Sequence, residues 1–139
     1  MRSENESCRG AAAASLLITA VGTDLARDRA DALLVALDSF YAGRRVQFAT
    51  TAARYGIPTA YFNRAFVEVR GLMSYGTDVA ESVRLVGVYA GRILKGAKAS
   101  DLPVVHSTKF QLAINLHTAK WLGLDVPLSL LAVADEVIE

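Results

Sequence analysis

The stretch Ala32-Leu33-Leu34-Val35-Ala36-Leu37 is apolar without interruption and ends at Asp38. A half-buried strand alternates apolar and polar residues, whereas a strand inside a parallel sheet is apolar on both faces because helices cover both of them. The stretch therefore predicts a central parallel strand, and it points to an α/β protein.

A strand–helix–strand unit extends from this stretch. Residues 44–55 have the apolar spacing of a helix, and Gly56 can end that helix as a C-terminal cap. The sequence "IPTAYF" at residues 57–62 then gives a second buried strand. Two strands joined by a helical crossover run parallel. The prediction is an α/β fold with a layered parallel sheet and flanking helices.

A third apolar stretch, "AFVEVRGLM" at residues 65–73, leads into the most regular helix of the chain. Asp78 and Glu81 have the spacing of a capping box, and Gly96 can end the helix. Apolar residues form a stripe at helical spacing along it: Val79, Val83, Val86, Ala90, Ile93 and Leu94. A stripe of this length predicts a large apolar area packed against a sheet.

The C-terminal part adds a strand and two short helices. Apolar and polar residues alternate from residue 110 to 116, which is typical of a half-buried strand. Asn115 can cap a helix through "HTAKWLG" that ends at Gly123, and Pro127 can open a last helical turn.

The first 22 residues are predicted to be a divergent or disordered leader, and Thr23 is predicted to cap a short helix through "DLARDRA". The run "AAAASLLITAV" is apolar, but acidic residues precede it and no small-x-small cleavage site follows it, so a working signal peptide is not expected. The run is also shorter than the roughly 20 residues of a membrane-spanning helix.

Composition excludes several classes of function. Fifteen basic and 14 acidic residues give a formal charge of +1, without the basic surplus of a nucleic-acid-binding protein. Cys8 is the single cysteine and is expected to be a bystander. His106 and His117 lack metal-ligand spacing, and no nucleophile or phosphate-binding motif occurs. We therefore expect no cofactor, no metal, no nucleic-acid partner and no enzymatic activity.

Several stretches together resemble a known family. They are "ADALLVALDSFY", "RYGIPTAYF", "GLMSYG", "GRILKGAKASDLPV" and, with the greatest specificity, "TKFQLAINLHTAKWLGLDVPLSLLAVADEVIE". From Ala30 to Glu139 the chain resembles the C-terminal part of the substrate-binding proteins of ABC transporters, in the tryptophan-binding-like group with the type I periplasmic binding fold.

The resemblance implies a two-lobed protein that closes around a small solute. Residues 23–139 would be the C-terminal lobe and the hinge-crossing segments, and the helix over residues 78–95 would return to pack on the other lobe. The implied partners are a small organic or amino-acid-like solute and a transporter permease, and the implied location is the periplasm. A chain that functions as it stands, without a signal peptide, is expected in the cytoplasm.

Candidate ligand contacts follow from the general position of binding sites at the carboxyl ends of parallel strands. The candidates are Asp38, Ser39, Phe40, Asn63, Ser74 and Tyr75. Asp38 could receive a ligand ammonium group, and the aromatic side chains could supply an apolar wall. For Asp38 the alternative is a helix cap, and for Phe40 and Tyr75 it is a packing role.

The sequence supports two hypotheses for the function. The first is the solute-binding component of an ABC-type importer. The second is a truncated remnant or stand-alone interaction module, in which the 78–95 helix forms a homo-oligomer because its apolar stripe has lost its partner. A sensor domain related to sugar-responsive regulators is a third and weaker possibility, since no DNA-reading helix is evident.

Overall fold

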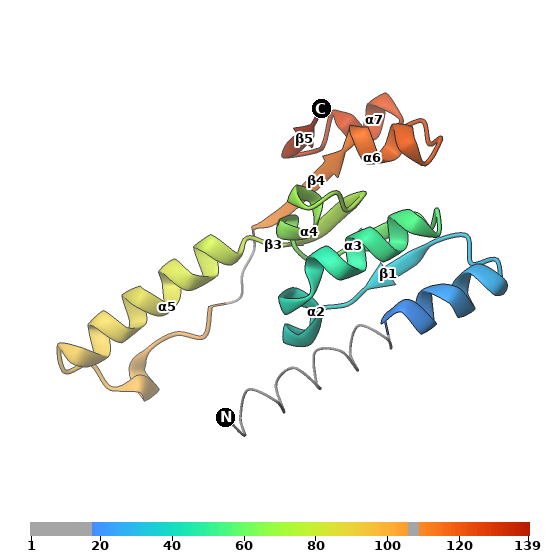
Figure 1. Cartoon of the computed structure of the whole chain (residues 1–139). Helices are drawn as coiled ribbons and strands as arrows, with labels where there is room; N and C mark the ends of the chain where they lie inside the picture. The colour runs from blue at the N-terminus through green and yellow to red at the C-terminus, as the bar shows by residue number, and fades with distance from the viewer. Residues whose placement is uncertain (1–17, 106–108) are drawn as a thin grey trace, which may run out of the picture.

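A computed structural model describes residues 18–105 and 109–139, and it shows a five-stranded sheet with helices packed around it (Figure 1). The strands are β1 (Leu33–Val35), β2 (Thr59–Tyr61), β3 (Met73–Thr77), β4 (Phe110–Asn115) and β5 (Glu136–Ile138). They lie side by side in chain order. The predicted α/β class with flanking helices is confirmed.

The sheet is mixed rather than wholly parallel. The pairs β1–β2, β2–β3 and β4–β5 are parallel, whereas β3 and β4 pair antiparallel from Met73 opposite Ile114 to Thr77 opposite Phe110. Between these two strands the chain leaves the sheet along α5 (Val79–Leu94) and turns back through a short 3-10 helix, η1 (Ala99–Asp101). It therefore re-enters the sheet at the end where it left and runs in the opposite direction.

The remaining helices connect the strands. They are α2 (Ser39–Gly43), α3 (Arg45–Arg54), α4 (Arg64–Glu68), α6 (Leu116–Trp121) and α7 (Leu128–Leu131). The predicted ends are confirmed at three glycines with positive φ: Gly56 at 65°, Gly96 at 98° and Gly123 at 71°. The predicted caps are confirmed too, because the side chain of Asp78 accepts from Ala80 N and Glu81 N and that of Asn115 accepts from Thr118 N.

Some local predictions are wrong. Thr23 does not begin a helix, because residues 18–27 are already helical and its hydroxyl donates to the carbonyl of Thr19 one turn earlier. The boundary expected at residue 22 thus falls inside a helix, where Gly22 lets this helix approach α3 closely. The capping box is also incomplete. The Glu81 carboxylate does not accept from the backbone N–H of Asp78 but binds Arg84 at 2.6 Å.

The third apolar stretch divides into a helix and a strand. Asn63 caps α4 by accepting a hydrogen bond from Ala65 N at 2.8 Å, and Arg70 takes a left-handed conformation with φ 73° before β3 starts. In β4 the residues from Leu112 to Asn115 are all buried, so the expected half-buried alternation is replaced by burial on both faces. The alternation of apolar and polar residues in β4 therefore does not match which of its side chains are buried.

The core lies between the first strands and α4. Val35, Tyr61 and Phe66 are almost fully buried, and the rings of Tyr61 and Phe66 stack with centroids 4.5 Å apart. Burial raises the pKa of Tyr61 to about 12, so its phenol stays neutral. Gly71 completes this packing, because a Cβ there would lie 2.6 Å from the carbonyl oxygen of Phe66 and 2.8 Å from the ring of Tyr61.

The stretch at residues 32–37 forms the edge of the sheet instead of its centre. Val35 is buried at 5% exposure, but Leu34 and Leu37 are 75% and 79% exposed. Among the described residues no strand pairs with the outer side of β1. The apolar pattern is that of a strand covered on both faces, and this structure leaves part of it uncovered.

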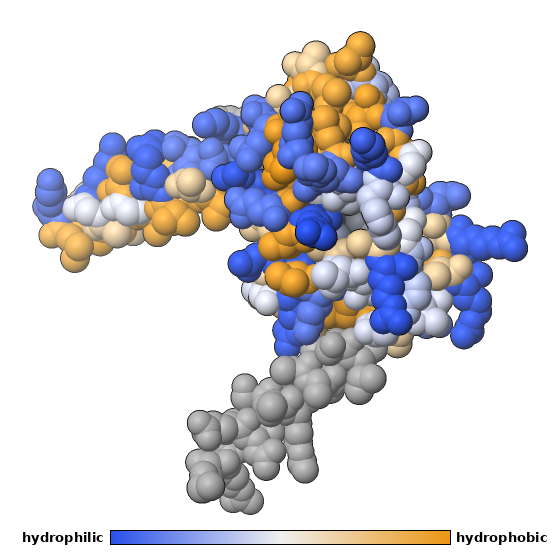
Figure 2. Space-filling model, turned by 45° about the horizontal axis from the view of Figure 1, so that its top comes forward, coloured by the Kyte–Doolittle hydropathy of each residue, from blue (hydrophilic) through white to orange (hydrophobic). Residues whose placement is uncertain are grey.

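The helix α5 projects away from the sheet (Figure 1). None of its residues is buried, and Val83, Val86 and Leu94 are 64%, 69% and 87% exposed. Figure 2 shows hydrophobic side chains along this arm, with hydrophilic ones on its other side. The predicted stripe is thus present on a regular helix, but the predicted burial against a sheet is not found.

Replacing Gly71 tests the tight core. In Gly71→Ala the added methyl meets the backbone of Phe66, which cannot swing away, so we expect the free energy of unfolding to fall by about 1–3 kcal/mol. Gly87→Ala in α5 is the matched control, since its Cβ meets nothing within 4 Å and should stabilise the helix by roughly 0.5–1 kcal/mol. Urea denaturation measures both; equal stabilities would contradict the packing described for Gly71.

Candidate functional site

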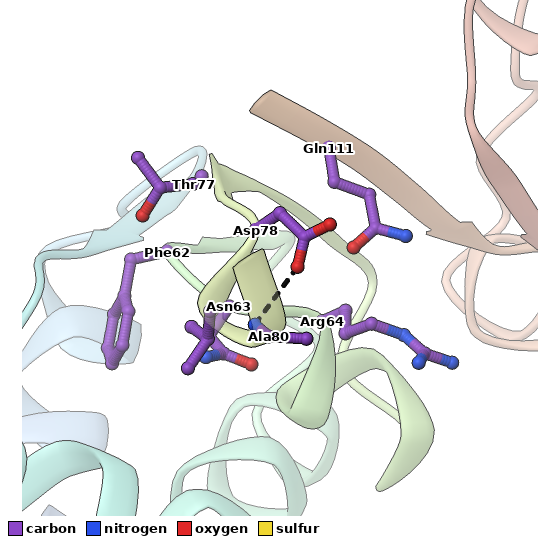
Figure 3. Close-up of a pocket in the computed structure, with 9 residues that line it drawn as sticks. Phe62, Asn63, Arg64, Thr77, Asp78, Ala80 and Gln111 are labelled. Atoms are coloured by element: carbon purple, nitrogen blue, oxygen red, sulfur yellow. Dashed lines mark hydrogen bonds between the residues drawn. The ribbon is translucent and has the colours of Figure 1, made fainter. Parts of the chain in front are cut away.

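The candidate site is a pocket of about 250 Å³ at one end of the sheet (Figure 3). It is formed by the segment that follows β2, by the junction between β3 and α5, and by β4. The lining residues are Phe62, Asn63, Arg64, Gly76, Thr77, Asp78, Val79, Ala80 and Gln111. This end holds the carboxyl ends of the parallel strands β2 and β3, the general position of ligand sites in such sheets.

A glycine brings two of these segments into contact. A Cβ at Gly76 would lie 1.9 Å from the carbonyl oxygen of Phe62, so only glycine permits this approach. The junction of β3 and α5 therefore lies directly against the chain that follows β2. Figure 3 shows the ring of Phe62 on one side of the pocket and Arg64 and Gln111 on the other.

Some polar groups of the pocket are already engaged. The side-chain oxygen of Asn63 caps α4, which leaves its amide N–H groups for another partner. The guanidinium of Arg64 binds Glu136 of β5 at 2.8 Å and Glu68 of α4 at 3.2 Å, so it is held toward β5. No hydrogen bond engages the side chains of Thr77 and Gln111 within the described part of the chain.

Asp78 links the segment in which the chain leaves the sheet for α5 to the segment in which it returns at Lys109. Its carboxylate lies 3.4 Å from Nζ of Lys109, and its backbone N–H donates to the carbonyl of Lys109 at 3.1 Å. The backbone N–H of Glu81 is the main cause that lowers the pKa of Asp78; partial burial opposes it, and Lys109 and the N–H of Ala80 add to the lowering. The pocket thus contains a carboxylate that remains charged at neutral pH.

The first group of predicted site residues lies outside this pocket. The Asp38 carboxylate accepts a hydrogen bond from Phe40 N at 2.7 Å and so caps α2, which is the alternative role considered for it. Ser39 begins α2 and is exposed. Phe40 is 39% exposed, with the guanidinium of Arg44 4.1 Å above its ring. All three follow the carboxyl end of β1, which lies at the same end of the sheet as the pocket.

Ser74 and Tyr75 do not line the pocket either, since the strand they were expected to end continues to Thr77. Ser74 was expected to line the cleft, but it is 1% exposed and lies opposite Ala113 of β4, so its hydroxyl is buried within the sheet. Tyr75 points to the other face of the sheet because side chains alternate along a strand. Its ring is 61% exposed and stacks on Phe110 at 5.6 Å, so its partner is another aromatic side chain.

Of the predicted residues, Asn63 alone lines the pocket. The sequence predicts Asp78 as a helix cap but not as a pocket residue, because the predicted strand ends at Met73 whereas β3 continues to Thr77. Gln111 had no local signal, since it comes from a strand that returns after the excursion along α5.

The part of the chain that the structure describes contains no group of three or more His, Cys, Asp or Glu placed to hold a metal ion. His117 is exposed on α6. Cys8 and His106 lie outside the described residues. Within the same described ranges, no helix is both long and apolar enough to cross a membrane.

A sequence profile of the family described as ABC transporter substrate binding protein matches residues 11–138. The chain belongs to this family. Its members are solute-binding components of transporters rather than enzymes, and they normally work outside the cytoplasmic membrane. The match begins 19 residues before Ala30, where the resemblance was expected to start. A comparison with curated proteins gave no match.

Solved structures with a similar fold include a conserved domain protein from Vibrio cholerae, with a TM-score of 0.80 and 23% identity. An ABC domain in complex with L-Trp from Streptococcus pneumonia has a TM-score of 0.79 and 29% identity. A ligand-free, open substrate-binding protein with adhesive properties from Clostridium difficile has a TM-score of 0.61 and 24% identity.

The aligned region is most of this chain but a minority of each relative. It covers 88%, 89% and 89% of this chain, and 41%, 43% and 41% of the three solved chains in the same order. The chain therefore spans less than half the length of the binding proteins it resembles.

The charge of Asp78 gives a testable pH dependence. Because its pKa is lower in the folded chain than the unfolded value of about 3.9, its charge stabilises the fold above that value, and the contribution disappears as pH falls through the folded pKa. Asp78→Asn keeps the helix cap but removes the charge. We expect the variant to melt below the parent chain at pH 7 and the difference to shrink as pH falls below the unfolded pKa of about 3.9.

Thermal unfolding followed by circular dichroism at several pH values measures this difference. Lys109→Gln removes one partner of the carboxylate but leaves the α5 cap, so it should lower stability less than Asp78→Asn. A melting difference between Asp78→Asn and the parent that does not change between pH 7 and pH 3 would contradict the role of the charge.

Proposed function

We propose that this chain is part of the solute-binding component of an ABC-type importer, and that its pocket is one wall of the ligand cleft. The position of the pocket carries the proposal. It lies where the chain leaves the sheet at Asp78 and returns at Lys109, so it adjoins both connections to the projecting arm. A ligand held there contacts the sheet-bearing lobe next to the connections about which two lobes can close.

The chemistry of the pocket suits a small amino-acid-like ligand. The Asp78 carboxylate can receive an ammonium group, while the amide of Asn63 and the hydroxyl of Thr77 can bind polar atoms. The ring of Phe62 offers an apolar wall. L-Trp bound to the related ABC domain from Streptococcus supports this class of ligand.

Asp38, Ser39 and Phe40 are proposed as a second, outer group of contacts. They follow the carboxyl end of β1, at the same end of the sheet as the pocket. One carboxylate oxygen of Asp38 caps α2, and the other has no hydrogen bond within the described residues. Closure of a second lobe would bring ligand groups to this rim. A ligand drives closure only by binding the closed state more tightly than the open one.

The arm fits the same proposal. The aligned relatives are more than twice as long, and α5 carries an apolar stripe with no covering surface within the described residues. We propose that this stripe packs on the other lobe of the complete binding protein. The proposed partners of that protein are a small solute and a transporter permease, and its proposed place of action is outside the cytoplasmic membrane.

Ligand binding tests the proposed cleft. Thermal-shift and calorimetric titrations with amino acids, L-Trp included, should give a saturable rise in melting temperature, because a ligand that binds only the folded state stabilises it. Asn63→Asp retains the α4 cap and loses the amide donors, so we expect about tenfold weaker binding. Asp38→Ala tests the outer contact, and Asp125→Ala on an exposed loop is the control.

A saturable shift that Asn63→Asp leaves unchanged would place binding elsewhere. An unaltered affinity in Asp38→Ala would remove Asp38 from the proposed outer contacts and leave the pocket assignment standing. A sharp unfolding transition with no shift for any ligand would favour the rival function described next.

The exposed stripe of α5 favours a second candidate, a remnant or interaction module that associates with its own copies. Exposed apolar surface of this kind marks an interaction site or promotes aggregation. On this reading the chain forms a homodimer through Val83 and Val86 without binding a solute.

Size-exclusion chromatography with light scattering at micromolar concentration distinguishes the two candidates. Self-association through α5 predicts a dimer that Val83→Glu dissociates, because the charge would be buried without a partner. Lys95→Glu, at the end of the same helix, should leave that dimer intact. A clean monomer for the parent chain would count against the interaction module.

A further inference from the structure

A second pocket, of about 540 Å³, lies at the opposite end of β3 from the proposed cleft. It is lined by Ala53, Arg70, Asn115, His117, Thr118 and Trp121. Arg70 precedes β3, and Asn115 ends the antiparallel strand β4, so both mark the amino end of β3. The two pockets share no lining residue, and the volume lies in the range of small-molecule sites.

The buried polar groups of this second pocket are structural. Asn115 accepts from Thr118 N and donates to the carbonyl of Val67 at 3.2 Å, and the Thr118 hydroxyl donates to the carbonyl of Arg70 at 3.1 Å. These hydrogen bonds join α6 to the turn before β3. They fix the floor of the pocket and leave its outer side chains to meet a ligand.

Three outer side chains converge there with different chemistry. Arg70 supplies a guanidinium, His117 an imidazole and Trp121 an indole that is 63% exposed. Within the described residues, no ion pair or hydrogen bond engages the side chain of any of the three. A cation beside an exposed aromatic surface is a combination that binds anions with a flat apolar part.

The backbone of Arg70 is also unusual. Its φ of 73° is a left-handed conformation that is unfavourable for a residue with a side chain. Glycine or asparagine would occupy this turn with less strain. The chain places a long cationic side chain there instead, at the edge of a pocket.

We propose that this second pocket binds a small aromatic carboxylate. The planar guanidinium of Arg70 pairs with the carboxylate, the indole of Trp121 stacks on the aromatic ring, and His117 offers a further polar contact. A singly charged carboxylate is favoured over a phosphate because Arg70 is the one permanently charged side chain that lines the pocket. The site is separate from the cleft assigned above and does not depend on it.

Trp121 makes the test direct, since it is the single tryptophan of the chain. Titration of the chain with benzoate should give a saturable change in tryptophan fluorescence. Arg70→Gly removes the cation and also relieves the left-handed strain, so the variant should fold at least as well as the parent. We expect its affinity for benzoate to fall by roughly ten- to hundredfold.

Arg29→Gly is the matched control, because Arg29 is the other arginine with positive φ, at 53°, and it does not line either pocket. It should bind benzoate like the parent chain. Asn63→Asp should also leave the titration unchanged, which separates this site from the cleft. Benzamide, which has the same ring without the charge, should give no saturable signal.

Two results would overturn the proposal. One is the absence of a saturable fluorescence change with benzoate in the folded parent chain. The other is a benzoate titration of Arg70→Gly that coincides with that of the parent.

Discussion

The antiparallel pairing of β3 with β4 is the interaction on which the rest of the structure depends. It joins two segments separated by the whole excursion along α5, and Asp78 and Lys109 close it with a backbone hydrogen bond and an ion pair. This pairing turns a parallel sheet into a mixed one. It also places the start of α5 and Gln111 beside the end of β2, where the pocket forms.

Two apolar surfaces remain exposed in this arrangement, the stripe along α5 and part of β1. The helix α5 is stabilised locally by its cap and its glycine stop, so it keeps a regular shape while its stripe remains exposed. The edge strand β1 exposes Leu34, although its sequence is typical of a strand covered on both faces. Both surfaces are consistent with a chain that aligns to less than half of its relatives.

The two ends of β3 differ in how their polar groups are used. At the carboxyl end, Asp78 both caps a helix and contributes a charge to the pocket. At the amino end, the side chains of Asn115 and Thr118 form hydrogen bonds with the backbone, and those of Arg70 and Trp121 line the second pocket. At the first end one residue thus both stabilises the fold and charges the pocket, whereas at the second end the hydrogen-bonded residues and the charged residue are different ones.

The sequence by itself determined the α/β class, the family, the caps at Asp78 and Asn115 and the helix stops at Gly56, Gly96 and Gly123. These features depend on residues within a few positions of one another, or on stretches long enough to be specific. The tertiary structure alone decided that Ser74 is buried, that β1 lies at an edge and that Gln111 joins Asn63 in the pocket. Each of these depends on which strands pair and in which direction, and such pairing joins segments far apart in the chain whose contacts leave no local pattern.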